Sequence, residues 1–398
     1  MERSDAAPLL VVECNSCHYH AADMNAPQIL ISAGEASSDM YAARLAKAIR
    51  GRVPNAQFFG MGGPRMKEEG VDLVADYHEV AVVGISEVLH KIPTVIAVQN
   101  RLKREAQKRG AKLALLVDSP GTHLGVARRM KQIGVPVGYF IGPQIWAWRA
   151  GRVRLVKRRV ARMVVIFPFE EKIYRDAGVP VSFVGHPLVD VVKATTDRAA
   201  FCAEFGLDPS RKIVTILPGS RPSEIARNYR RVVAACELIG RIGDVQFVHA
   251  AAHGLKSEFF ERYAKGSVEI RRVEGATYDA LAAADVSIVA SGTATVEAAL
   301  LDAPMVVVYR VKPSTAFILK GLLRTPFIGM VNLIAGREVA PEFIQDAFTP
   351  EAVAAEVREL LESEAARNEM RAGLADVRAK LGPGGAIERA ADIFAGML

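Results

Sequence analysis

The stretch IVTILPGSRPSEI, residues Ile213–Ile225, decides the fold of this chain. Its apolar first half predicts a buried strand of a parallel sheet. Pro218 begins a turn, and a helix is expected to start near Arg221. The first N–H groups of a helix have no partner within it, and the positive end of the helix dipole attracts anions. We therefore expect Gly219, Ser220 and Arg221 to bind a diphosphate.

A second joint of the same kind occurs in VSIVASGTATVE, residues Val286–Glu297. The pattern again predicts a strand, a turn and a helix, with the turn formed by Ser291, Gly292 and Thr293. Glu297 falls in the second turn of the helix, where its carboxylate can bind ribose hydroxyls while the first joint binds phosphate. The alternative is a purely structural role for both joints, because glycine turns between a strand and a helix occur throughout α/β proteins.

The length of 398 residues exceeds what one core usually serves and predicts two domains of about 150–200 residues each. Half of the residues are hydrophobic and 24% are charged, as in soluble α/β enzymes. Strand patterns alternate with helical patterns along the chain, so we expect an α/β fold with two Rossmann-like parallel sheets. Strands are expected at residues 28–33, 57–61, 71–75, 114–117, 135–141, 163–167 and 181–185, and then at 213–217, 245–250, 286–290 and 305–309.

These patterns divide the chain into four parts. Residues 24–190 are expected to form the first domain and residues 191–365 the second. Residues 366–398 are expected to be helices that pack back onto the first domain, because no strand remains there for them to cover. Residues 1–23 show no periodic pattern, which predicts a disordered extension or a start codon assigned too far upstream.

Composition narrows the class of protein. The net charge of +7 is compatible with an anionic substrate, a nucleic acid or an anionic membrane surface. No signal peptide is visible, and no apolar run reaches the about 20 residues that span a bilayer. The four cysteines do not make a disulfide framework in a chain of this length, so we expect a protein of the reducing cytoplasm. The motif Cys14-Asn-Ser-Cys17-His18 resembles a haem attachment site, and His20 would allow zinc, but neither an export signal nor a second ligand pair accompanies it. No Asp-x-Asp triplet is present, so we expect no metal and no cofactor.

Two acids follow strands of the first domain. Gly34 and Glu35 come directly after the first strand, and Asp118 comes after the strand at 114–117. Open α/β sheets place their ligands at the carboxyl ends of strands, so Asp118 is a candidate general base in a cleft. As alternatives, Glu35 would serve only the helix dipole, and Asp118 would bond only to amides of its own loop.

Two surface segments have unusual compositions. Residues 79–92 carry more apolar side chains than one buried stripe needs, which predicts either core packing or an exposed surface for an acyl chain or a membrane. Residues 149–162 contain seven basic side chains and no acid. This is more positive charge than solubility requires and suggests a functional surface. The alternative is an ordinary helix face exposed to solvent.

Other loops contain further polar residues that are candidates for binding a ligand. Residues 325–345 are interpreted as a loop, in which Asn332 and Glu338 are candidate ligand contacts. His186 directly follows the last strand expected in the first sheet, at residues 181–185.

Several stretches together resemble the lipid-A-disaccharide synthase family, glycosyltransferase family 19. The resemblance implies a GT-B architecture, in which two Rossmann-like domains face a cleft and the second holds the donor nucleotide. It implies that UDP-2,3-diacylglucosamine and 2,3-diacylglucosamine 1-phosphate (lipid X) are joined into a β-1,6 disaccharide 1-phosphate, with release of UDP. The stretches that carry it are AGEASSD (33–39), GMGGPRM (60–66), GPQIWAWRAGRV (142–153), PFEEKIY (168–174), FVGHPL (183–188), LPGSR (217–221), SGTATVE (291–297) and NLIAGREVAPEFIQ (332–345).

One motif departs from the family pattern. Where the family commonly reads Asp-x-Pro-Asp-Phe-Asn, this chain has Asp118-Ser-Pro-Gly-Thr-His123. Asp118 remains the catalytic candidate, and His123 is a possible substitute or helper. The resemblance implies that Arg221 takes the charge of the diphosphate. It places Gly219, Ser220, Arg221, Ser291, Gly292, Thr293, Glu297, Asn332 and Glu338 at the donor, and Gly34, Glu35, Trp148, Arg149 and His186 at the acceptor side of the cleft.

The implied substrates are acylated, which predicts an enzyme bound peripherally to the anionic inner face of the inner membrane, through residues 82–89 and 149–162. No nucleic acid is expected as a partner, and a homodimer is compatible with the sequence. The alternative is another GT-B enzyme acting on UDP-GlcNAc, either a 2-epimerase or a transferase to a different lipid. A dehydrogenase is disfavoured, because no Gly-x-Gly-x-x-Gly follows the first strand.

Overall fold

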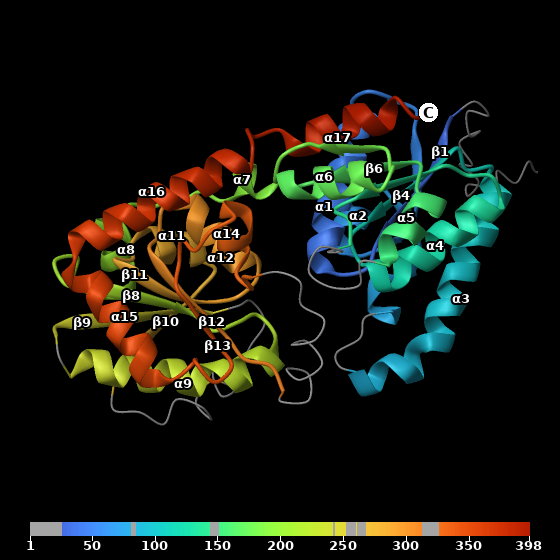
Figure 1. The fold of residues 1–398 in the computed structure, drawn as a ribbon. Coiled ribbons are helices and arrows are strands. Elements are labelled where there is room, and N and C mark those ends of the chain that lie inside the picture. The colour runs from blue at the N-terminus through green and yellow to red at the C-terminus, as the bar shows by residue number, and fades with distance from the viewer. Residues whose placement is uncertain are drawn as a thin grey trace, which may run out of the picture.

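The computed structural model describes residues 26–80, 85–143, 151–241, 243–251, 260, 268–312 and 326–398, without the side chains of 85–90. These residues form two parallel sheets, each with helices on both faces (Figure 1). This arrangement confirms the predicted α/β fold with two Rossmann-like domains. The motif at Cys14–His18, the Trp148-Arg149 pair and the side chains of the apolar stretch 82–89 lie outside the described part of the chain.

The first sheet has the strand order β3-β2-β1-β4-β5-β6-β7. Its strands are buried on both faces, with Ile29 and Ile31 in one core cluster and Leu30 in another. The strands are β1 (Gln28–Ala33), β2 (Gln57–Gly62), β3 (Asp72–Asp76), β4 (Leu113–Val117), β5 (Val137–Phe140), β6 (Arg162–Val165) and β7 (Val181–Phe183). The helices of this domain are α1 (Ala36–Arg50), α2 (Pro64–Glu68), α3 (Ile85–Arg109), α4 (Pro120–Gln132), α5 (Arg152–Arg159) and α6 (Pro168–Asp176).

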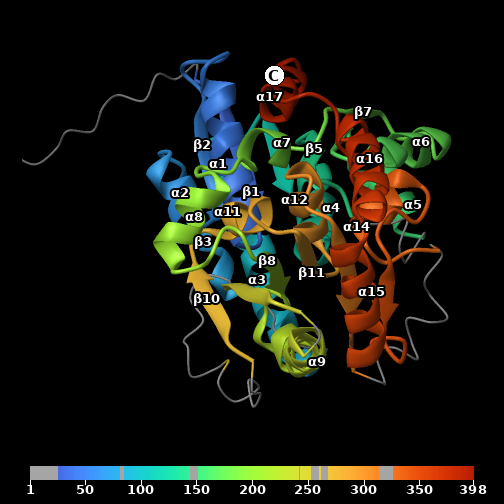
Figure 2. The same cartoon turned by 90° about the vertical axis from the view of Figure 1, so that its left-hand side faces the viewer.

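The second sheet has the order β10-β9-β8-β11-β12-β13. Figure 2 looks at this domain from its outer side, with α9 and α15 next to each other and α11, α12 and α14 in a separate layer. Its strands are β8 (Lys212–Leu217), β9 (Val245–Ala251), β10 (Ile270–Glu274), β11 (Val286–Ala290), β12 (Met305–Tyr309) and β13 (Glu342–Ile344). Its helices are α8 (Arg198–Phe205), α9 (Pro222–Gly240), α11 (Thr277–Ala282), α12 (Thr293–Leu300), α14 (Met330–Ala335), α15 (Pro350–Glu362) and α16 (Glu364–Lys380).

Each sheet has one point where the chain reverses its direction of winding. In the first sheet β1 lies between β2 and β4, and in the second β8 lies between β9 and β11. Loops on either side of such a point diverge and leave a crevice at the carboxyl ends of the strands. The Glu35 and Asp118 loops border the first crevice, and the loops at Gly219 and Ser291 border the second.

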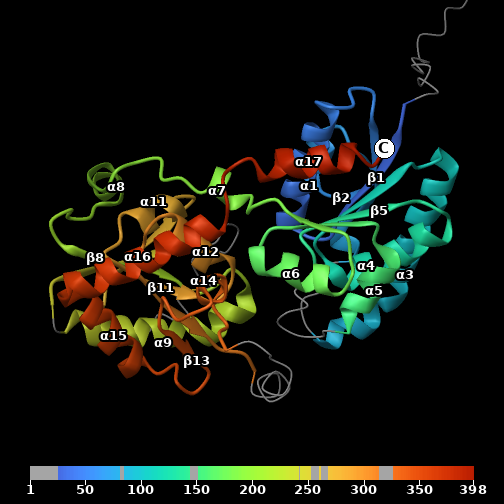
Figure 3. The same cartoon turned by 45° about the horizontal axis from the view of Figure 1, so that its top comes forward.

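Within the residues that the structure describes, the chain crosses between the domains twice. It leaves the first domain after β7 through α7 (Leu188–Val191), and α17 (Ala386–Ala395) returns to pack on α1 (Figure 3). Helix α16 packs on α12 and α14, so it stays on the second domain. The predicted return of the C-terminal helices is therefore made by α17, and the expectation for residues 366–380 is corrected. Helix α16 stays behind because Met370, Leu374 and Val377 are buried in the core that serves the second sheet.

The elements that the sequence does not predict include the strands β10 and β13 and the helix α14. Edge strand β10 has the sequence IRRVE, whose charged residues hide its pattern. Residues 325–345, expected to be a loop, contain α14 and β13. Both elements are short, and tertiary contacts with β12 and α16 decide their structure more than local sequence does.

Candidate active site

The crevice of the first sheet holds two carboxylates, those of Glu35 and Asp118. Asp118 follows β4 and Glu35 follows β1, its neighbour in the sheet. A Cβ atom at Gly34 would collide with the side chain of Ser119, so glycine lets the two loops approach each other. Asp118 and Ser119 both have left-handed backbones, with φ of 54° and 49°. Such conformations are uncommon in residues with a Cβ and concentrate at functional sites.

The carboxyl group of Asp118 has a raised pKa, which makes its carboxylate a better base. Burial, followed by the negative charge of Glu35, raises the pKa of Asp118 to about 6. A hydrogen bond from the N–H of Ser119 opposes this shift. A base whose pKa lies near neutral pH is deprotonated in the cell and still accepts a proton readily.

His123 lies behind Asp118 and not in front of it. Its side chain is fully buried, with Nδ1 2.6 Å from the carbonyl oxygen of Asp118 and Nε2 2.9 Å from Oγ of Ser32. Burial lowers the pKa of His123 to about 4, so the imidazole is neutral. Both nitrogens are used inside the protein, and the idea that His123 substitutes for Asp118 as the base does not fit this geometry.

The first joint of the second sheet forms as the sequence predicts. Strand β8 ends at Leu217, and α9 begins at Pro222 after Gly219 with φ of 132°. Asn228 of α9 holds the turn, since its Nδ2 donates to the carbonyl oxygen of Pro218 at 2.9 Å.

A carboxylate occupies this turn. Oε2 of Glu224 accepts from the backbone N–H groups of Ser220 and Arg221, at 3.2 and 3.4 Å. Oε1 of Glu224 lies 3.2 Å from the guanidinium of Arg221, which is otherwise exposed. The turn therefore binds an anion, and here the anion is a side chain of the same helix. This role of Glu224 is not among the sequence-based expectations, although a position three residues after Arg221 is typical of a helix capping residue.

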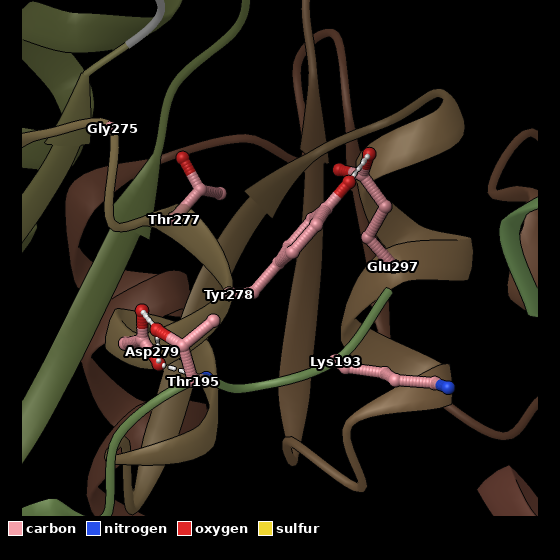
Figure 4. A pocket seen from close by; sticks show the side chains of 7 residues that line it. All are labelled: Lys193, Thr195, Gly275, Thr277, Tyr278, Asp279 and Glu297. Carbon is pink, nitrogen blue, oxygen red and sulfur yellow. Dashed lines mark hydrogen bonds between the residues drawn. The ribbon is translucent and has the colours of Figure 1, made fainter. Parts of the chain in front are cut away.

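The second joint places Glu297 in a cavity. Ser291 donates from Oγ to the carbonyl oxygen of Ile328 at 2.9 Å, and Gly292 adopts φ of 145°, which favours glycine. Figure 4 shows the hydroxyl of Tyr278 pointing at the carboxylate of Glu297, 3.5 Å away. The cavity has a volume of about 300 Å³ and is lined by Lys193, Thr195, Gly275, Thr277, Tyr278, Asp279 and Glu297. Burial raises the pKa of Glu297, and the hydrogen bond from Tyr278 opposes that rise.

Tyr41 of α1 is a buried tyrosine that the sequence alone does not single out. Burial raises its pKa, and the charges of Glu297 and Asp118 act in the same direction. Tyr41 of the first domain therefore feels the charge of Glu297, a carboxylate of the second domain. Among hydrophobic residues of an amphipathic helix, a tyrosine at this position gives no signal of its own.

Asn332 and Glu338 lie on the segment that leads into β13. Asn332 is fully buried and its amide bonds within the chain: Oδ1 accepts from the N–H groups of Val339 and Ala340, and Nδ2 donates to Ala340 and Glu342. Glu338 is exposed and acts electrostatically on Glu356 of α15. Asn332 thus shapes the segment before β13 in this structure, and Glu338 lies at the surface.

His186 lies at the crossing between the domains. It is buried, its Nδ1 accepts from the N–H of Leu188 at 3.1 Å, and its ring lies 5.2 Å from that of Phe167. Burial lowers the pKa of His186 to about 4. Its geometry fits a role in shaping the crossing. In the described part of the chain, no group of acids, histidines and cysteines has the arrangement of a metal site.

Comparison with known proteins now decides the family. The family model described as lipid-A-disaccharide synthetase matches residues 29–390. The chain belongs to this family. The lipid-A-disaccharide synthase of Syntrophus aciditrophicus (strain SB) is 45% identical over 371 residues, covering 92% of this chain and 97% of that protein. The enzyme of Myxococcus xanthus (strain DK1622) is 43% identical over 370 residues, with coverages of 92% and 97%.

Solved structures confirm the GT-B fold at low sequence identity. The structure of S. aureus MnaA with UDP has a TM-score of 0.62 at 15% identity, covering 91% of this chain and 94% of that chain. Acinetobacter baumannii MurG has a TM-score of 0.57 at 13% identity, with coverages of 93% and 99%. The chain is thus a glycosyltransferase of lipid A biosynthesis with a GT-B fold, as its motifs indicated.

Proposed function

We propose that this enzyme joins UDP-2,3-diacylglucosamine to lipid X with inversion at the anomeric carbon, giving the β-1,6 disaccharide 1-phosphate and UDP. The observation that carries the proposal is the position of Asp118. It directly follows β4 at the carboxyl end of the first sheet, beside the loop of Glu35, and burial raises its pKa to about 6. A base and a nucleotide site on opposite sides of a cleft are what direct displacement requires.

Asp118 would act as the general base. Inversion needs a group that removes the proton of the acceptor 6-hydroxyl while that oxygen attacks the anomeric carbon from the face opposite the diphosphate. In the same step, the bond between the anomeric carbon and the diphosphate oxygen breaks. The proton passes to the Asp118 carboxylate, and the electron pair leaves with UDP.

The second domain would hold the donor. Arg221 and the N–H groups of Ser220 and Arg221 would stabilise the charge that develops on the diphosphate. Glu297, in its cavity of about 300 Å³, would accept hydrogen bonds from the ribose hydroxyls. Ser291, Gly292 and Thr293 would contact the nucleotide from the adjacent turn. Asn332, which holds the backbone of the segment before β13, and Glu338, whose side chain is exposed, remain candidates for donor contacts.

The enzyme would work at a membrane surface, since both proposed substrates carry acyl chains. Among the described residues, no helix is long and apolar enough to span a bilayer. Ile92 and Ile96 of α3 are each 44% exposed, and α5 carries the exposed cations Arg154, Lys157 and Arg158. Apolar side chains that enter the interface and cations that attract anionic lipids are the typical parts of a peripheral anchor. Helices α3 and α5 both pack on α4, and their exposed side chains support binding to the inner face of the inner membrane.

Asp118→Asn tests the chemistry. We expect the variant to fold and to bind UDP like the wild type, but to lose about 10²–10⁴ in kcat, the usual contribution of a general base. UDP release and disaccharide formation from acylated donor and lipid X are the measurements. Asp176→Asn, an exposed acid on α6, is the matched control and should retain full activity. Wild-type kcat in Asp118→Asn would disprove the assignment, and turnover of UDP-GlcNAc without an acceptor would favour an epimerase.

A further inference from the structure

His123 remains without a role in the proposed chemistry, although it contacts the turn that carries Asp118. A carbonyl oxygen can only accept a hydrogen bond, so Nδ1 of His123 carries the proton and donates it to Asp118 at 2.6 Å. Nε2 is then an acceptor and receives the hydroxyl proton of Ser32 at 2.9 Å. The tautomer is thereby fixed, and no nitrogen of this ring is left to react with a substrate.

The turn itself needs support. Asp118 and Ser119 are consecutive, both carry a Cβ, and both have positive φ. A residue with a Cβ keeps a left-handed backbone only when its surroundings hold it there. If the turn relaxes, the direction of the Cα–Cβ bond of Asp118 changes and its carboxyl group moves.

Three hydrogen bonds hold the peptide groups on both sides of Asp118. Its N–H donates to the carbonyl oxygen of Phe140 at 2.9 Å and fixes the peptide plane before it. Its carbonyl oxygen accepts from the hydroxyl of Tyr139 at 2.7 Å and from Nδ1 of His123, which fixes the plane after it. With both planes fixed, the Cα–Cβ bond has one direction.

We infer that His123 is a positioning residue: its Nδ1–H holds the peptide after Asp118 in the left-handed turn and so directs the Asp118 carboxyl group into the cleft. The inference rests on the proposed function, because the direction of Asp118 matters for turnover only if Asp118 is the base. It names a residue that acts through Asp118 and never meets the substrate.

Substitutions that keep one nitrogen at a time test this role. His123→Asn keeps an amide donor where Nδ1 lies, His123→Gln keeps a polar group where Nε2 lies, and His123→Ala keeps neither. We expect His123→Asn to retain most of its kcat, whereas the Gln and Ala variants lose about 100-fold, the effect of a misplaced catalytic group. KM and UDP affinity should be unchanged. Ser32→Ala, which removes only the partner of Nε2, should stay close to wild type.

A second measurement separates positioning from folding and from the chemistry. Hydrogen–deuterium exchange in residues 117–124 should be faster in the Gln and Ala variants than in His123→Asn or the wild type, with the remaining domain unchanged. A folded His123→Asn variant as inactive as His123→Ala would overturn the inference, as would Gln and Ala variants with wild-type kcat. If Asp118→Asn has wild-type activity, the proposed function fails, while the exchange pattern still reports whether His123 holds the turn.

Discussion

The pKa of one carboxyl group links the structure to the activity. Asp118 owes its raised pKa first to burial and second to Glu35, which lies on the neighbouring loop. The sequence indicates that two acids follow adjacent strands. It does not indicate that Asp118 is half-buried while Glu35 is exposed, because this depends on how the loops pack across Gly34.

This pKa predicts how activity depends on pH. The base works only when deprotonated, so kcat/KM should be full above a pH of about 6 and fall as the pH drops through that value. Glu35→Gln removes a negative charge that disfavours ionisation of Asp118, so the fall in activity should move to lower pH. A pH profile of both enzymes measures this shift, whatever Glu35→Gln does to the maximal rate. Glu105→Gln, near the C-terminal end of α3, is the control, and a profile that moves equally in both variants would contradict the prediction.

The start of α9 shows what a strand–turn–helix pattern predicts and what it leaves out. The turn after Gly219, the start of the helix and the exposed guanidinium of Arg221 all follow from the sequence. That Glu224 occupies the anion site does not, because its side-chain direction depends on the turn geometry. A bound diphosphate must displace this carboxylate from the N–H groups of Ser220 and Arg221.

Glu224 and Arg221 should therefore change donor affinity in opposite directions. Arg221→Ala removes a charge-assisted contact and should weaken UDP binding by about 1.5–3 kcal/mol. Glu224→Gln removes the competing charge and should strengthen it by about 1 kcal/mol, the scale of two charges a few ångström apart in water. Calorimetry with UDP decides both, with Glu237→Gln further along α9 as the control. Unchanged affinity in both variants would place the diphosphate elsewhere.

Much of the architecture follows from the sequence, because alternating strands and helices with buried apolar runs leave few topologies. The strands that border both crevices agree with their predicted bounds within one or two residues, and the loops that carry Asp118, Arg221 and Glu297 lie where they are expected. Interactions between distant segments are what the sequence does not reveal: the effect of Glu297 on Tyr41, the internal bonds of Asn332, and the different packing of α16 and α17. Each of these depends on three-dimensional packing that no local pattern encodes.

The double crossing between the domains depends on Arg389 of α17. Its guanidinium donates to the carbonyl oxygens of Val184, Pro383 and Gly384 at 2.6 to 2.9 Å, tying the outgoing and returning chains together. Arg389→Ala leaves these carbonyl groups without this donor and should lower the free energy of unfolding by about 2–3 kcal/mol. Thermal and urea unfolding measure this loss. The control is Arg371→Ala, which removes an exposed hydrogen bond to Asn368 within α16 and should change the free energy of unfolding little. An equal loss of unfolding free energy in both variants would show that the bonds of Arg389 at the crossing do not matter more than an exposed hydrogen bond.

Binding of the whole molecule to a membrane should depend on the exposed cations of α5. Arg159 differs from its neighbours, because its Nη1 donates to the carbonyl oxygen of Leu124, so its replacement would disturb the packing on α4. Arg154, Lys157 and Arg158 are exposed, and each contributes about 1 kcal/mol near an anionic leaflet, less at high salt. Replacing these three by Gln should release the enzyme from anionic vesicles, while activity on detergent-dispersed substrates persists.

The control for this experiment removes the same charge from the other domain. Arg230 and Arg358 lie on α9 and α15, Arg241 directly follows α9, and replacing these three by Gln should leave sedimentation with vesicles intact. If both triple variants dissociate equally, net charge and not the α5 surface determines binding. If the α5 variant still sediments at low salt, α5 is an ordinary solvated face, and the exposed Ile92 and Ile96 of α3 must provide the anchor. In that case the double substitution Ile92→Ser and Ile96→Ser should release the enzyme from vesicles although the charge substitutions do not. The reason is that the anchor would then be the insertion of apolar side chains and not the attraction of cations.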